Sequence, residues 1–96
     1  MPFAIVLAPE AVEDLARLKA TARAAVKAAL KTHLRYEPQK TSRSRIKRLR
    51  GLSRPQYRLR VGDIRVFYDV ADDVVEVLAI VPKSETTSWL AQFGKL

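Results

Sequence analysis

Three arginines near a predicted tight turn are the residues whose types and spacing could do chemistry. Two β-rich runs on either side of Gly62-Asp63 predict an antiparallel hairpin. Strand alternation places Arg58, Arg60 and Arg65 together on its exposed face, opposite the apolar side chains, with Cβ atoms within roughly 5–10 Å of one another. Guanidinium groups this close repel each other unless an anion lies between them, and a phosphodiester matches their planar donors. The alternative is three solvated arginines on a sheet surface.

Positive charge is concentrated in the same part of the chain. The protein has 96 residues and a net charge of +8. Residues 40–65 hold ten basic residues and one acid, so this segment carries +9 and the other 70 residues carry −1. A solubilising face would mix both signs, and a membrane-surface patch is the other alternative. A segment of one sign favours nucleic acid or an acidic protein as the partner.

Cleavage of RNA through its 2′-hydroxyl needs a base, stabilisation of the transition-state charge, and an acid for the leaving oxygen. Arginine supplies only the charge, because it stays protonated. The acid/base candidates are His33, Lys83, the tyrosines and the carboxylates. His33, the only histidine, has helical spacing with Val26 and Leu30, which favours packing at the core boundary over catalysis. The sequence lacks acids with metal-ligand spacing and a Gly-rich phosphate loop, so we expect no metal and no cofactor.

Hydrophobic periodicity predicts two helices after a first strand at residues 2–7. The first helix begins at Ala8-Pro9, because proline suits the first helical position. The second helix ends near Tyr36, before Pro38. Together they predict a helical hairpin. The apolar stripe of the first helix comprises Ala11, Val12, Leu15 and Leu18.

The second half of the chain predicts strands and one more helix. The run at 74–81 is apolar on both faces except at Glu76, so it should be a central strand. Ser84 is the predicted N-cap of the last helix, which has Trp89, Leu90 and Phe93 as apolar contacts. The predicted strands are an edge strand at 46–52 and three antiparallel strands at 56–61, 64–71 and 74–81.

These elements predict one α+β domain over residues 1–96. We expect a small curved antiparallel sheet of about four strands, with the helical hairpin packed on one face and a short C-terminal helix. Hydrophobic residues make up 48% of the chain, which is enough for a core. The absence of cysteine, of a long apolar run and of a signal peptide predicts a cytoplasmic protein that does not enter a membrane.

Four short motifs follow one another over nearly the whole chain: Leu49-Arg50-Gly51, Tyr57-Arg58-Leu59-Arg60, Ile64-Arg65-Val66-Phe67-Tyr68 and Val77-Leu78-Ala79-Ile80-Val81-Pro82-Lys83. Their order, spacing and total length resemble the RelE branch of the RelE/ParE toxin superfamily. The resemblance implies a type II toxin that enters the A site of the 70S ribosome, cuts mRNA there and is neutralised by a co-expressed antitoxin. It also implies roles for individual residues.

By position, the resemblance implies that Arg58 and Arg60 hold and activate the RNA, that Arg65 stabilises the phosphate and that Lys83 assists. The basic residues expected to dock ribosomal RNA are Lys47, Arg48, Arg50 and Arg54. The end of the chain departs from the family pattern, which usually places an aromatic or histidine acid/base there. Trp89 stands near that position and can stack on a base but cannot transfer a proton, and core packing is the preferred interpretation of it.

Three hypotheses of function therefore remain open. The first is a ribosome-dependent mRNA endonuclease. The second is a DNA gyrase inhibitor of the ParE type, whose helical hairpin tends to be longer than the roughly 40 residues between Pro9 and Leu49 allow. The third is a degenerate toxin that only binds its antitoxin. In each case an acidic antitoxin segment should cover the basic face or the apolar surface of the helices.

Overall fold

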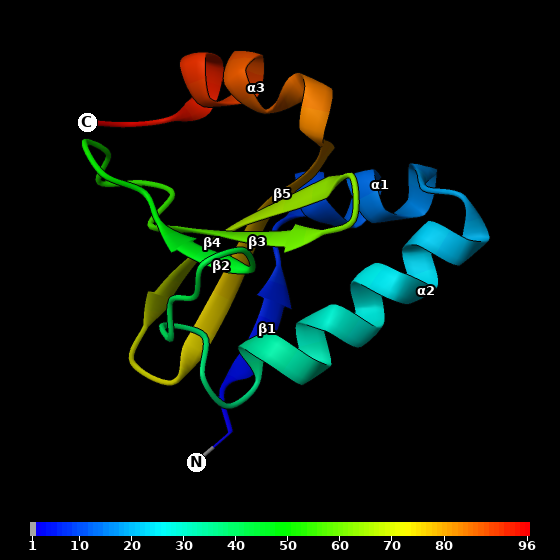
Figure 1. The fold of residues 1–96 in the computed structure, drawn as a ribbon, viewed down its shortest axis with the longest axis horizontal. Coiled ribbons are helices and arrows are strands. Elements are labelled where there is room, and N and C mark those ends of the chain that lie inside the picture. Colours follow the sequence, from blue (N-terminus) through cyan, green and yellow to red (C-terminus); the bar gives the residue numbers. More distant parts are fainter. Residues whose placement is uncertain (1) are drawn as a thin grey trace.

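A mixed five-stranded sheet organises residues 2–96, the part of the chain that the computed structural model describes (Figure 1). Two helices follow the first strand and a third follows the last. In chain order the elements are β1 (Ala4–Leu7), α1 (Pro9–Arg17), α2 (Ala20–Ala29), the π-helical turn η1 (Leu30–Leu34), β2 (Ile46–Arg48), β3 (Tyr57–Val61), β4 (Ile64–Ala71), β5 (Val74–Pro82), the 3-10 turn η2 (Lys83–Glu85) and α3 (Thr86–Phe93).

The order of strands in the sheet is β1-β5-β4-β3-β2. The predicted α+β class is confirmed, as are the edge position of β2 and the inner position of β5. Two details differ from the prediction, because the sheet has five strands and β1 pairs parallel with β5. Parallel neighbours need a long crossover, and everything from α1 to β4 provides one here. A four-residue apolar strand carries no sign of this pairing in its own sequence.

The main core lies between the sheet and the first two helices. Leu59, Val66 and Tyr68 point toward the helices, as strand alternation predicts. Val12 was expected in the apolar stripe of α1, but its side chain is 53% exposed. It lies about 100° around the helix from the buried Ala11. The helix-derived side chains of this core are Ala11, Leu15, Leu18, Val26, Ala29, Leu30 and Leu34.

A bulge in β5 lets this strand supply both faces of the sheet. Leu78 is an extra residue opposite the junction of Phe67 and Tyr68. The bulge reverses the alternation, so Ile80 faces the helices. The amide of Ile80 donates a hydrogen bond of 3.0 Å to Oδ2 of Asp14 in α1. The helix and the irregular part of the strand are thereby fixed to each other.

The third helix packs on the opposite face of the sheet. Trp89 stacks on Phe67 of β4, with ring centroids 4.8 Å apart and an angle of 5° between the planes. The prediction of Ser84 as N-cap is wrong, because η2 precedes the helix and Glu85 occupies the cap position. The backbone amide of Lys83 donates a hydrogen bond of 2.7 Å to the Asp63 carbonyl. This bond fixes the start of the 3-10 turn that precedes the helix. Among residues 2–96, none of the helices has the length and apolar character to cross a lipid bilayer.

Candidate functional site

The register of the sheet arranges basic residues in two rows across β2, β3 and β4. In the first row, Arg60 of β3 lies directly opposite Arg65 of β4. In the second row, Lys47 of β2 lies directly opposite Arg58 of β3. The amide of Arg60 donates to the carbonyl of Arg45 at 2.8 Å, which adds Arg45 to the first row. These side chains lie on the face that also carries Phe67 and α3. We call Arg45, Lys47, Arg58, Arg60 and Arg65 the arginine face.

Arg65 is the charged residue that the fold buries most deeply, with a relative exposure of 7%. Its Nη1 donates to the carbonyls of Gly62 at 2.8 Å and Ile64 at 3.0 Å, so its guanidinium is held beside the β3–β4 turn. We expected Arg65 on an exposed face, and this is wrong. Arg65 lies opposite Val81 in the sheet. Trp89 and Leu90 of α3 pack against the apolar cluster that contains Val81, so this part of the sheet is covered. None of the ion pairs within residues 2–96 includes Arg65.

The second distinctive group of the arginine face is Arg58. Its Nε is buried without a hydrogen-bond partner in the described part of the chain. Burial lowers the pKa of Arg58, and the charges of Arg65 and Arg60 lower it further. Two arginines thus sit close together, partly withdrawn from water, with no carboxylate paired to either of them among residues 2–96. A bound anion would relieve the repulsion between these charges.

Lys83 joins the same end of the sheet through its backbone. Its amide donates to the Asp63 carbonyl in the β3–β4 turn, beside the carbonyl of Gly62 that holds Arg65. Its side chain is exposed. The four predicted catalytic residues, Arg58, Arg60, Arg65 and Lys83, therefore come from neighbouring positions around one hairpin.

Three of the predicted RNA-docking residues lie elsewhere. The guanidinium of Arg48 lies 5.0 Å from the ring centroid of Tyr57, on the helix side of the sheet. Arg50 is exposed in the turn after β2. Arg54 forms ion pairs with Asp69 at 2.9 Å and Glu76 at 2.8 Å. The charge of Arg54 is thus compensated by two carboxylates of the fold. Of the four predicted RNA-docking residues, Lys47 is the one that the register places beside Arg58.

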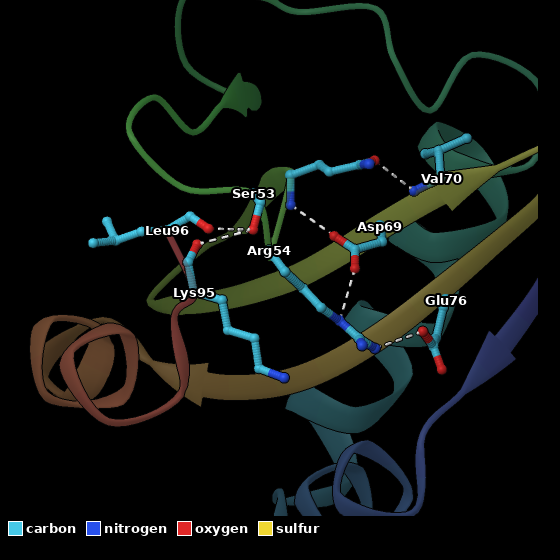
Figure 2. A network of polar contacts seen from close by, with 8 residues as sticks. Ser53, Arg54, Asp69, Val70, Glu76, Lys95 and Leu96 are labelled. Atoms are coloured by element: carbon cyan, nitrogen blue, oxygen red, sulfur yellow. Dashed lines mark hydrogen bonds and ion pairs between the residues drawn. The ribbon is translucent and has the colours of Figure 1, made fainter.

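Arg54 belongs to a network that ties the end of the described chain to the sheet (Figure 2). Ser53 Oγ donates to the Leu96 carbonyl at 2.9 Å, and the amide of Lys95 donates to the Arg54 carbonyl at 2.8 Å. Asp69 Oδ1 accepts from the amide of Gln56 at 2.7 Å. This network anchors the segment that follows α3. It thereby also helps to hold α3 against the face of the sheet that carries Arg65.

The predicted packing role of Trp89 agrees with its contacts. Its ring lies between Phe67 and Phe93, stacked on the first and tilted 38° to the second at 5.5 Å. Leu90 completes the attachment of α3 to the sheet. Trp89 therefore fixes the helix that covers one side of the arginine face.

Of the other acid/base candidates, Tyr68 lies on the helix side of the sheet and His33 lies at the β2 edge, beside Arg45. Tyr68 points into the main core, where its hydroxyl donates to the Pro38 carbonyl at 2.6 Å and where burial raises its pKa. His33 lines a hollow at the β2 edge together with Arg45. Partial burial lowers the pKa of His33, and the charge of Arg45 lowers it further. The arginine face can thus bind an anion and stabilise developing negative charge, and Lys47 within it and Lys83 beside the β3–β4 turn are the lysines that can supply a proton.

Sequence reasoning missed Arg45 as a member of this site. It precedes the edge strand by one residue, and only the register of β2 against β3 places it beside Arg60. An alternation pattern across residues 45–47, basic-apolar-basic, was the available signal. The strand is too short for that signal to be distinctive.

A comparison with protein families identifies what kind of protein carries this fold. Residues 5–86 match the family of ParE toxins of type II toxin–antitoxin systems, parDE. The chain therefore belongs to the RelE/ParE superfamily and is a type II toxin. The resemblance seen in the sequence motifs is confirmed. No curated protein sequence matches the chain.

Solved structures of toxins share the fold. The RelBE2 toxin–antitoxin complex of Mycobacterium tuberculosis contains a chain that is 25% identical, with a TM-score of 0.70, covering 85% of this chain and 99% of that one. A mutant of the Escherichia coli toxin RelE in the free state is 24% identical, with a TM-score of 0.71 and coverage of 96% and 97%. The RelB–RelE complex of Methanococcus jannaschii is 19% identical, with a TM-score of 0.67 and coverage of 88% and 96%.

Proposed function

We propose that this toxin is a ribosome-dependent endoribonuclease that cuts mRNA and so inhibits translation. The observation that carries the proposal is the pair Arg58 and Arg65, two partly or fully buried guanidiniums without a paired carboxylate in residues 2–96. An uncompensated buried charge costs stability. The cost is recovered when a phosphate binds, which is the expected arrangement for a site that functions by holding a phosphodiester.

The reaction that fits this site is attack of the RNA 2′-oxygen on the adjacent phosphorus. The P–O bond to the 5′-oxygen breaks, leaving a 2′,3′-cyclic phosphate and a free 5′-hydroxyl. Arg58 and Arg65 stabilise the charge that develops on the phosphoryl oxygens, and Arg60 holds the strand. Lys83 donates a proton to the leaving 5′-oxygen. We assign removal of the 2′-hydroxyl proton to the ribosome, because arginine is too strongly protonated to act as a base.

A cognate antitoxin is the proposed protein partner. Three of the structural relatives are toxin–antitoxin complexes, from Mycobacterium tuberculosis, Methanococcus jannaschii and Pyrococcus horikoshii. An apolar hollow between β1 and α2 has Phe3, Ile5 and Leu30 among its lining residues, with Lys27 and Lys31 also lining it. An amphipathic acidic segment of the antitoxin matches this mixture of apolar surface and positive charge.

Primer extension on a defined mRNA in a purified translation system tests the enzymatic proposal. With wild-type protein we expect cuts at codon-periodic positions, only when ribosomes are present. Arg65→Gln should reduce cutting by about 10²-fold, the usual loss when a donor to a transition-state anion is removed. Lys27→Gln is the control, because it removes one positive charge from an exposed position of α2 on the other side of the sheet. Equal cutting by wild type and Arg65→Gln would overturn the proposed site.

Inhibition of DNA gyrase is the second candidate, and one observation favours it. The matching family model is that of ParE toxins. The position of Tyr68, buried on the helix side of the sheet and away from the arginine face, agrees with a toxin that acts by binding alone. Intact mRNA in the presence of ribosomes, from protein that still arrests growth and induces a DNA damage response, would decide for this candidate.

A further inference from the structure

A hollow lies between the β2 and β3 ends of the arginine face, and the cleavage step proposed above assigns no ligand to it. Ser44, Arg45, Arg60 and Gly62 line it. We propose that this hollow is a second phosphate subsite, which holds the phosphate next to the one at Arg58 and Arg65. The proposal rests on the proposed RNA-binding function and names a further part of its substrate site.

The chemistry of the lining supports an anion as the occupant. Two of its four residues are arginines with exposed side chains, and a third offers a hydroxyl. Gly62 has a φ of +57° in the tight turn and leaves open space where a Cβ would stand. None of the ion pairs within residues 2–96 involves Arg45 or Arg60. Glu37, the acid that lines the neighbouring hollow with Arg45, pairs with Lys40 at 3.5 Å instead.

The geometry of the sheet separates this subsite from the first one. Arg60 has Arg65 as its neighbour on β4 and Arg45 as its neighbour on the β2 side. Adjacent strands are about 4.8 Å apart, so the backbones of Arg45 and Arg65 are separated by about 10 Å. Arg65 is held toward its own turn by the carbonyls of Gly62 and Ile64. Two consecutive phosphates of a single strand can therefore occupy the two ends of the row, with Arg60 between them.

Two uncleavable probes of different length test the subsite. The first is a 2′-O-methyl dinucleotide with a single phosphodiester, and the second is a 2′-O-methyl tetranucleotide with three. Replacing Arg45 with glutamine should weaken tetranucleotide binding about tenfold and change dinucleotide binding less than twofold, because only the longer probe reaches the hollow. Arg58→Gln should weaken binding of both probes. The backbone amide of Arg45, which donates to Ser42 Oγ, is kept in the variant.

The matched control is Arg43→Gln, which removes the same charge two residues away from Arg45 in the same exposed segment. The subsite is overturned if Arg43→Gln weakens the tetranucleotide as much as Arg45→Gln does. It is also overturned if Arg45→Gln affects both probes equally or neither, or if wild-type protein binds both probes with the same affinity.

The binding test and the cleavage test can contradict the subsite and the proposed function independently of each other. Wild-type protein that cuts mRNA, combined with an Arg45→Gln variant that binds both probes normally, would keep the proposed function and remove the subsite. Length-dependent binding that requires Arg45, from protein that leaves mRNA intact on ribosomes, would keep the subsite and remove the nuclease activity.

Discussion

At the scale of single residues, the arginine face is a place where folding and function oppose each other. Arg58 keeps a buried Nε without a hydrogen-bond partner in residues 2–96, beside the like charges of Arg60 and Arg65. Such an arrangement lowers the stability of the free protein. The same groups are ready to receive a phosphate without first breaking ion pairs, which is how preorganised anion sites gain strength.

Replacing Arg58 with methionine should therefore stabilise the protein while weakening RNA binding. The change removes an unsatisfied donor and keeps the apolar stem, so we expect the free energy of unfolding to rise by about 1 kcal/mol. For a domain of this size that corresponds to a Tm increase of about 4–8 °C. Thermal denaturation measures it, with the exposed Arg60→Met as the control that should change Tm little. A lower Tm for Arg58→Met would show that Arg58 is a structural residue.

His33 should make stability depend on pH. Its pKa is lowered from the ordinary value of 6.5 by burial and by the charge of Arg45. The folded state thus resists protonation, so stability is constant above about pH 6.5, declines as the pH falls from there through the lower folded-state pKa, and is flat below it. Glu37 and Lys40 line the same hollow and contribute to the field.

The measurement is an NMR titration of His33 combined with thermal denaturation between pH 5 and 7.5. We expect His33→Gln to abolish the decline and Arg45→Gln to raise the pKa of His33 toward its ordinary value. Titration of His33 at or above pH 6.5 in the wild type would contradict this account.

At the scale of elements, local patterns predicted most of the fold, and long-range packing decided the rest. Period-2 alternation identified β3 and β4 and the side chains that face the helices. The parallel pairing of β1, the bulge at Leu78 and the burial of Arg65 all depend on contacts between distant segments. The register gathers the predicted catalytic residues around one hairpin. Arg54 instead forms ion pairs with Asp69 and Glu76, which lie far from it in the sequence.

The third helix provides the element-scale prediction, because Trp89 is its main attachment. Trp89→Ala should lower the free energy of unfolding by about 2–3 kcal/mol, less than for a fully buried tryptophan because the ring is only half-buried. Amide hydrogen exchange in α3 should accelerate, and binding of the dinucleotide probe should stay within twofold of wild type. Phe93→Ala is the control, since that ring is largely exposed.

A different result would restore the base-stacking role for Trp89. The decisive combination is a tenfold loss of dinucleotide affinity in Trp89→Ala, together with unchanged protection of the α3 amides. Stacking of one base on an aromatic ring contributes about 1–3 kcal/mol, so a loss of that size would be measurable.

At the scale of the whole molecule, the question is whether RNA responds to the total charge of +8 or to the place where the charge is held. Two double variants separate these possibilities. Arg58→Gln/Arg60→Gln changes the arginine face, and Lys27→Gln/Lys31→Gln changes exposed positions on the helix side. Each removes two positive charges and leaves the same net charge.

Binding of an uncleavable single-stranded RNA at several salt concentrations then distinguishes a site from a general attraction. Each phosphate contact on a single strand contributes about 0.7 to the slope of log K against log salt. The arginine-face variant should therefore lose about 1.4 from the magnitude of that slope, whereas the helix variant should keep the wild-type slope, because its lysines lie away from the bound strand. Equal losses in the two variants would mean that RNA is attracted by net charge alone. The buried guanidiniums of Arg58 and Arg65 would then need a different ligand, and the acidic segment of an antitoxin would be the next one to test.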